Sequence, residues 1–157
     1  MKRERNNCLF RFIMILLTAG LIAFAFIHSS MNADKSGAES EVTMGFLQNF
    51  FDALNIKVEF TDYIVRKLAH FAEYTAIGIM LMNTAYAFNK SRPYVFYPHI
   101  LFAGLFTAVI DEAIQIYVPG RAGLITDVLL DFSGVVIGTV AMLIILTIYK
   151  AVRRKRR

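Results

Sequence analysis

Long apolar stretches alternate with short polar ones along most of the chain. The first covers residues 12–33 and contains no formally charged side chain. About 20 apolar residues are enough for a helix to cross the hydrocarbon core of a bilayer. Three further stretches of sufficient length follow at residues 63–88, 98–118 and 127–149. The pattern predicts an all-α integral membrane protein with four transmembrane helices.

The longest polar segment, residues 29–62, separates the first two spans. Its second half, residues 42–55, places large apolar side chains on one helical face. This spacing predicts an extracytoplasmic amphipathic helix in the membrane interface, although simple packing over the end of the bundle explains it equally well. Only nine residues, 118–126, connect the third and fourth spans. These two spans must therefore be antiparallel neighbours.

Composition and charge agree with a membrane protein and give it an orientation. With 57% hydrophobic residues and a mean hydropathy of +0.52, the chain is too apolar for an ordinary soluble domain of 157 residues. Twelve of its 17 Lys and Arg residues lie in the two terminal tails and in the loop between the second and third spans. Cytoplasmic segments carry such an excess. We therefore expect both termini in the cytoplasm, with basic tails at residues 1–11 and 150–157 around a membrane domain of residues 12–149.

Two alternatives concern the ends of the chain. A cleavable signal peptide would explain the basic N-terminus followed by an apolar run, but its removal would leave three spans and upset the charge balance. The basic C-terminal tail is expected to anchor the topology and to touch anionic lipid headgroups. Nothing in this charge pattern indicates a nucleic-acid partner.

Ionisable side chains occur inside the predicted spans, where they are costly and usually mark a functional site. At 100° per residue, Arg66, His70 and Glu73 share one face of the second span. Lys67 lies beside that face. Further polar residues occupy the third span, the loop after it and the start of the fourth span: Asp111, Glu112, Gln115, Arg121, Asp127 and Asp131.

The polar residues of the last two spans continue stripes of small residues. Gly134 and Gly138 lie on the same face as Asp127 and Asp131. Small residues four apart let helix backbones approach closely in lipid, so this face is expected to point at the bundle axis. The sequence therefore predicts one polar pocket, open to the outside of the membrane. A buried ion-pair network that holds the helices in register is the alternative.

Two sets of roles follow from the chemistry of these side chains. A histidine beside carboxylates in a pocket of low dielectric suits proton transfer. The candidate catalytic residues are His70, Glu73, Asp111, Glu112 and Asp127. Cations and amides suit the recognition of an anionic headgroup. The candidate ligand-binding residues are Arg66, Lys67, Gln115, Arg121 and Asp131.

Three mechanisms remain open. The first is an enzyme that acts on a lipid-linked envelope intermediate, in which water would have to attack directly because no serine or cysteine is placed as a nucleophile. The second is a non-catalytic protein that binds or shields a ligand. In the third, His70 and Glu73 hold a hard divalent ion such as Mg²⁺ or Mn²⁺ with the facing carboxylates. We expect no cofactor, since three nearby cations compete for these acids.

The ordered motifs resemble the VanZ-like family of small bacterial membrane proteins. They are R-K-x-x-H-x-x-E-Y from Arg66, D-E-x-x-Q followed by P-G-R from Asp111, and D-x-x-x-D-x-x-G-x-x-x-G from Asp127. The resemblance covers about residues 29–142, including the serine pair that often closes the family's first span. Many relatives carry Asn at the position of Asp131.

The resemblance implies a multi-pass protein of the bacterial cytoplasmic membrane with an envelope role at the outer leaflet. It also implies lowered susceptibility to teicoplanin, a glycopeptide that captures the D-Ala-D-Ala end of cell-wall precursors. The expected partners are membrane lipids and either a lipid-linked cell-wall intermediate or the glycopeptide. Neither the residues nor the resemblance indicates an oligomeric state.

Overall fold

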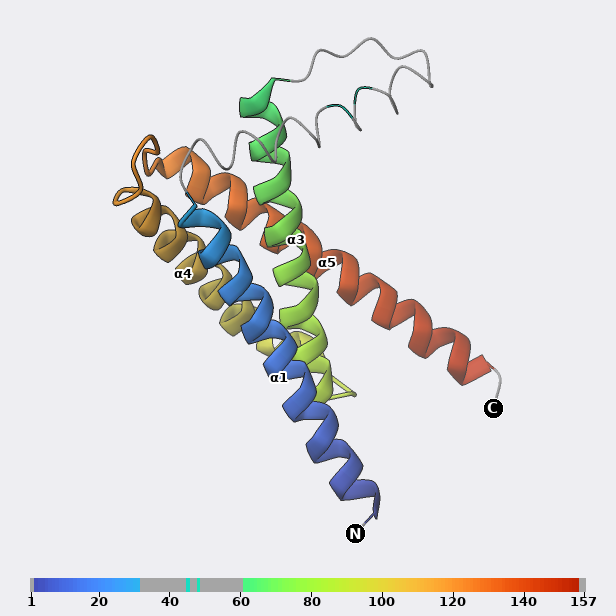
Figure 1. Cartoon of the computed structure of the whole chain (residues 1–157). Coiled ribbons are helices and arrows are strands. Elements are labelled where there is room, and N and C mark those ends of the chain that lie inside the picture. Colours follow the sequence, from blue (N-terminus) through green and yellow to red (C-terminus); the bar gives the residue numbers. More distant parts are fainter. Residues whose placement is uncertain (1, 32–44, 46–47, 49–60, 156–157) are drawn as a thin grey trace.

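Helices make up the secondary structure that a computed structural model of this chain describes (Figure 1). The described residues are 2–31, 45, 48 and 61–155. The predicted amphipathic helix of residues 42–55 lies, apart from Gly45 and Gln48, outside them. The elements are α1 (Lys2–Ser29), α3 (Asp62–Phe88), the 3-10 helix η1 (Pro93–Phe96), α4 (Tyr97–Gln115) and α5 (Ile125–Lys155).

Three segments of the described chain are long and apolar enough to cross a membrane. They are Asn7–Ser29 in α1, Pro93–Gln115 in η1 and α4, and Ile125–Lys155 in α5. The second predicted span forms α3 but does not meet this criterion, because its polar side chains lower its mean hydropathy. By length and composition the described residues therefore give three candidate spans, where the sequence pattern predicted four.

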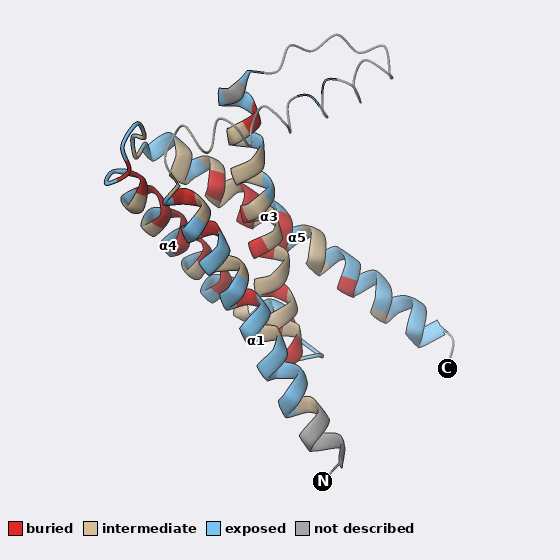
Figure 2. Cartoon of the chain, in the orientation of Figure 1, coloured by how far each residue is buried: buried red, intermediate tan, exposed pale blue. Residues whose placement is uncertain are grey.

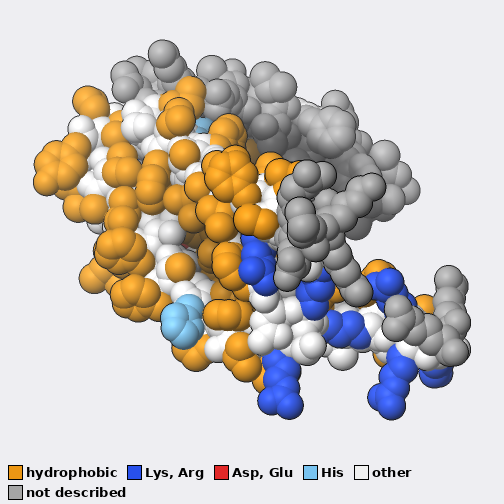
Figure 3. All heavy atoms as spheres, turned by 90° about the horizontal axis from the view of Figure 1, so that it is seen from below, with side chains coloured by type: hydrophobic (Ala, Val, Ile, Leu, Met, Phe, Trp, Pro, Cys, Tyr) orange, Lys and Arg blue, Asp and Glu red, His pale blue; other side chains and the backbone are white. Residues whose placement is uncertain are grey.

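The helices meet so that their ends form two distinct regions. Asn7 at the start of α1 accepts a hydrogen bond from Lys90, and Lys150 near the end of α5 donates one to the carbonyl oxygen of Ser91. The first region, which we call the terminal end, thus joins the start of α1, the turn between α3 and η1, and the end of α5. Lys and Arg side chains are prominent in the view of this end (Figure 3). At the opposite region, the cavity end, α1 and α4 finish while α3 and α5 begin.

The closest helix packing joins α3 and α5. Gly134 of α5 faces the α3 backbone, since a Cβ atom built on it would lie 2.7 Å from the carbonyl oxygen of Phe71. A Cβ atom on Gly138 would collide with the carbonyl oxygen of Thr75. The structure thus confirms that the small residues of α5 face another helix and let the two backbones approach closely.

Apolar residues fill the space between the helices and also cover their outer faces. Tyr74, Ile77 and Val135 are fully buried where α3 and α5 meet the rest of the bundle. Large side chains on the outside are exposed, among them Phe102 and Ile125. Figure 2 shows this division, with buried residues between the helices and long exposed stretches on α1 and α5. Exposed apolar area of this extent suits contact with lipid rather than water.

Candidate functional site

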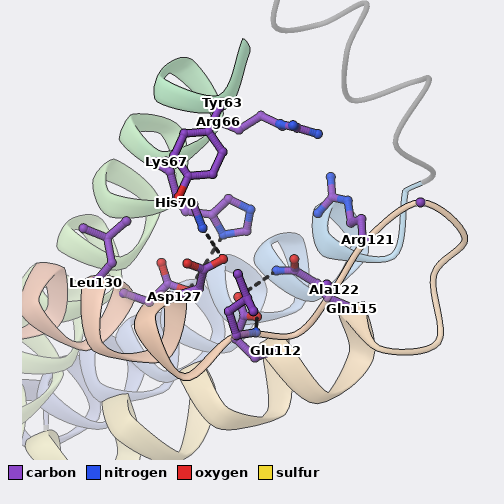
Figure 4. A pocket seen from close by; sticks show the side chains of 13 residues that line it. Tyr63, Arg66, Lys67, His70, Glu112, Gln115, Arg121, Ala122, Asp127 and Leu130 are labelled. Atoms are coloured by element: carbon purple, nitrogen blue, oxygen red, sulfur yellow. Dashed lines mark hydrogen bonds and ion pairs between the residues drawn. The ribbon is translucent and has the colours of Figure 1, made fainter. Parts of the chain in front are cut away.

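A cavity of about 190 Å³ occupies the cavity end of the bundle (Figure 4). Residues of α3, α4 and α5 and of the loop between α4 and α5 line it. Eight of the ten residues selected from the sequence are among them: Arg66, Lys67, His70, Glu112, Gln115, Arg121, Asp127 and Asp131. The other two, Glu73 and Asp111, lie behind its lining. The structure therefore brings the predicted polar residues together at one place.

At the floor of the cavity and directly behind it, one histidine and two aspartates from three helices lie close together. His70 Nδ1 of α3 lies 3.7 Å from Asp111 Oδ2 of α4 and 3.8 Å from Asp131 Oδ2 of α5. The side chains of Asp111 and Asp131 are 0% and 1% exposed, respectively, so both are almost completely buried. Two carboxylates are thus buried beside a single imidazole.

Asp111 is held in place from two sides. Ser29 Oγ at the end of α1 donates a hydrogen bond of 2.7 Å to Asp111 Oδ2. Gln115 Nε2, one turn along α4, donates to the same oxygen at 3.3 Å and to Glu112 Oε1 at 3.1 Å. Ser29 lies outside the three sequence motifs that contain the predicted site residues, although the family resemblance covers a serine pair at this position.

Glu112 connects α4 to the loop that follows it. Its Oε2 atom accepts a hydrogen bond of 2.9 Å from the backbone N–H of Leu124. The loop can fold back this closely because Gly123 has no Cβ atom. A Cβ atom built at this position would lie 2.6 Å from the carbonyl oxygen of Glu112. Gly120 takes a φ of 79°, a conformation that glycine adopts without steric cost. Glu112 therefore shapes the rim of the cavity as well as lining it.

Glu73 faces α1 rather than the cavity. His28 Nδ1 lies 2.7 Å from Glu73 Oε1, and the His28 ring stacks on that of His70 with centroids 6.0 Å apart. Sequence reasoning missed His28, although it is the only titratable side chain in the first apolar stretch. A single titratable residue in an apolar span was the sequence signal that could have identified His28 as part of the polar cluster.

The three cations of the cavity differ in their partners. Lys67 Nζ forms an ion pair with Asp127 Oδ2. Within the described part of the chain, neither Arg66 nor Arg121 has an ion-pair partner. Burial lowers the pKa of the Arg121 guanidinium below its ordinary value, and the nearby Arg66 lowers that pKa further. A guanidinium nevertheless remains protonated, so two positive charges line the same cavity.

The cavity therefore has a cationic rim above an acidic floor. In the view of Figure 4, the Arg66 and Arg121 side chains lie above those of Asp127 and Glu112. A rim of this kind can attract an anion, while the floor can exchange protons or bind a cation. The individual catalytic and binding roles assigned from the sequence remain predictions.

Comparison with known proteins gives one match. The sequence model of the VanZ/LLP1 family matches residues 12–147, a range that contains all four described α-helices for most of their length and the whole cavity. No curated protein and no solved structure matches the chain. Because the family match extends over most of the 157 residues, the chain belongs to the VanZ/LLP1 family.

Proposed function

We propose that this protein resides in the cytoplasmic membrane and binds the anionic headgroup of an envelope lipid, or of a lipid-linked envelope intermediate, in its cavity. The observation that carries the proposal is the pair of guanidinium groups at the rim. Arg66 and Arg121 have no acidic partner among the described residues, and both line the same cavity, so their like charges repel each other. An anion between them would remove that repulsion.

The geometry of arginine favours a phosphate or carboxylate ligand. Its planar guanidinium presents N–H donors that match two oxygens of such a group at once, which a lysine cannot do. Lys67 contributes less positive charge to a ligand because Asp127 already neutralises it. The two arginines are therefore the proposed headgroup contacts.

An apolar groove next to the cavity supports a lipid ligand rather than a free anion. Ile64, Leu68 and Phe71 of α3 line this groove, which has a volume of about 350 Å³. It shares Tyr63, Lys67 and Leu130 with the cavity. A headgroup at the arginines would leave its acyl chain next to this groove. A polar site continuous with an apolar one fits an amphiphile.

We further propose that α3 crosses the membrane as a fourth span and that the cavity faces outward. Hydrogen bonds tie the start of α1 and the end of α5 to the same turn at the terminal end, which supports an even number of crossings. The polar side chains of α3 face the cavity and the neighbouring helices, so its low hydropathy does not require it to leave the bilayer. The excess of Lys and Arg at the terminal end favours the cytoplasmic side for that end.

Lipid binding by variants of the purified full-length chain tests the headgroup proposal. Phosphatidylglycerol in nanodiscs of otherwise neutral lipid serves as the probe, with binding measured by native mass spectrometry. Arg121→Gln and Arg66→Gln should each weaken binding roughly tenfold or more, since a hydrogen bond to a charged group contributes about 1.5–3 kcal/mol. Arg121→Lys should recover only part of the loss.

Arg92→Gln is the matched control, because Arg92 is exposed at the terminal end. It should bind the lipid as the wild type does. Equal binding by the Arg121 and Arg92 variants would contradict the proposal. If the physiological ligand is the cell-wall intermediate that glycopeptides capture, cells expressing the wild type should lose teicoplanin susceptibility and cells expressing Arg121→Gln should keep it.

A further inference from the structure

We propose that His70, Asp111 and Asp131 form a divalent-cation site at the floor of the cavity. Each residue offers one ligand atom, and the three atoms lie within 4.8 Å of one another. The three side chains come from α3, α4 and α5, so a bound ion would tie the three helices together. The inference goes beyond headgroup recognition, which concerns the arginines at the rim.

The distances are close to those of a coordination sphere. With metal–ligand bonds of about 2.1 Å, ligand atoms at tetrahedral or octahedral angles lie roughly 3.0–3.4 Å apart. His70 Nδ1 lies 3.7 Å and 3.8 Å from the nearest oxygens of Asp111 and Asp131. Movements of a few tenths of an ångström, which side-chain torsions provide, would bring all three atoms within bonding distance of one ion.

Unpartnered oxygen atoms at the same place provide an independent reason for a ligand. In the described part of the molecule, Asp131 Oδ1 and Oδ2 and Asp111 Oδ1 are buried without a hydrogen-bond partner. A buried polar atom left without a partner costs on the order of 1–3 kcal/mol, and more if it is charged. Both side chains are almost completely buried. A cation bound by the two carboxylates would offset the cost of burying these oxygens.

The neighbouring side chains orient the Asp111 carboxylate. Ser29 and Gln115 both donate to Asp111 Oδ2, the oxygen 3.7 Å from His70 Nδ1, while Asp111 Oδ1 on the same carboxylate has no hydrogen-bond partner among the described residues. Partners that orient a ligand in this way are typical of metal sites. Lys67 is paired with Asp127, and no Lys or Arg ion pair to Asp111 or Asp131 occurs among the described residues.

The donor set indicates which ions fit. Mg²⁺ and Ca²⁺ are usually bound through oxygen alone, whereas Mn²⁺ and Zn²⁺ accept an imidazole nitrogen together with carboxylates. One nitrogen and two carboxylates therefore favour Mn²⁺ or Zn²⁺. The set is smaller than the one suggested by the sequence: it keeps His70, Asp111 and Asp131 but not Glu73, which is engaged by His28. His70 and Asp131 line the cavity, so ions and water can enter from there.

Direct metal titration of the purified full-length protein tests the proposal. After treatment with a chelator, the wild type is titrated with MnCl₂ while free Mn²⁺ is followed by electron paramagnetic resonance, and with ZnCl₂ by calorimetry. We expect one equivalent of at least one of the two ions to bind per chain. Asp131→Asn and His70→Gln should each lower the affinity roughly tenfold or more, as expected for the loss of a ligand.

His99→Gln is the matched control, since it makes the same chemical change at an exposed histidine in the first turn of α4. It should leave the affinity unchanged. Arg121→Gln should also retain the ion, which separates this site from the headgroup site. Failure of the folded wild type to bind either ion would overturn the proposal. Equal affinity in wild type, Asp131→Asn and His70→Gln would do the same and would favour a proton shared by the two carboxylates.

Discussion

At the scale of single residues, hydrogen bonds between buried polar side chains connect the helices. Asp111 has one oxygen that accepts hydrogen bonds from Ser29 and Gln115 and another that has no hydrogen-bond partner among the described residues. In an environment of low dielectric, such bonds are strong and their loss is costly. Ser29 therefore matters for stability although it carries no charge.

The adjacent serines allow that claim to be measured. Ser29→Ala removes the donor to a buried carboxylate oxygen, so we expect the free energy of unfolding to fall by about 1–3 kcal/mol. Ser30→Ala is the control, because Ser30 is exposed and its hydroxyl group bonds back to carbonyl oxygens of its own helix. Unfolding of the purified protein in a titration with denaturing detergent gives both values. Equal stabilities of the two variants would show that the Ser29 bond contributes nothing.

The residue types of the site could be read from the sequence, but not their partners. The spacing of His70 and Glu73 placed both on one face of a helix, which is correct. It could not show that Glu73 turns to His28 of α1 while His70 turns to Asp111 and Asp131. Periodicity assigns a face within one helix, whereas a partner depends on how that helix is rotated against its neighbours.

At the scale of elements, the contact between α3 and α5 positions the site. Gly134 and Gly138 bring the two backbones together below Asp131, and Thr139 Oγ1 donates a hydrogen bond of 3.3 Å to the carbonyl oxygen of Gly78. This close contact sets the separation between His70 on α3 and Asp131 on α5. The small-residue stripe is therefore a structural requirement for the polar cluster.

Adding one methyl group to this contact should separate the helices. Gly138→Ala places a Cβ atom against the carbonyl oxygen of Thr75, which is backbone and cannot move aside cheaply. We expect a loss of about 1–3 kcal/mol in the free energy of unfolding, the usual cost of overpacking. Gly20→Ala in α1 meets no atom within 4 Å and should be neutral or slightly stabilising. The same detergent titration compares them, and a neutral Gly138→Ala would mean that the helices can shift freely.

At the scale of the whole molecule, the cavity lies at one end of the bundle, and the start of α1 and the end of α5 lie at the other. Described Lys and Arg residues at the terminal end include Arg11, Lys90, Arg92 and Lys150, whereas the cations at the cavity end are accompanied by carboxylates. This polarity underlies the proposed orientation, with the cavity outside the cell.

Labelling of single cysteines tests the orientation. In a Cys8→Ser background, which removes the natural thiol, Ala122→Cys places a thiol at the cavity end and Ser91→Cys places one at the terminal end. A maleimide that cannot cross membranes should label position 122 on intact cells. It should label position 91 only after the membrane is permeabilised. The reverse pattern would invert the topology and remove the outward-facing cavity.

Local patterns in the sequence determined the helical membrane class of this protein and most of the polar residues that line its cavity. The length and periodicity of an apolar stretch are properties of one chain segment, and the distribution of basic residues is a property of the sequence. Each can therefore be evaluated without coordinates. The tertiary structure alone decided that α1 completes the site through His28 and Ser29 and that Asp111 lies beneath the cavity rather than in its wall. Those features depend on the rotation and separation of helices far apart in sequence, which close packing between their side chains sets.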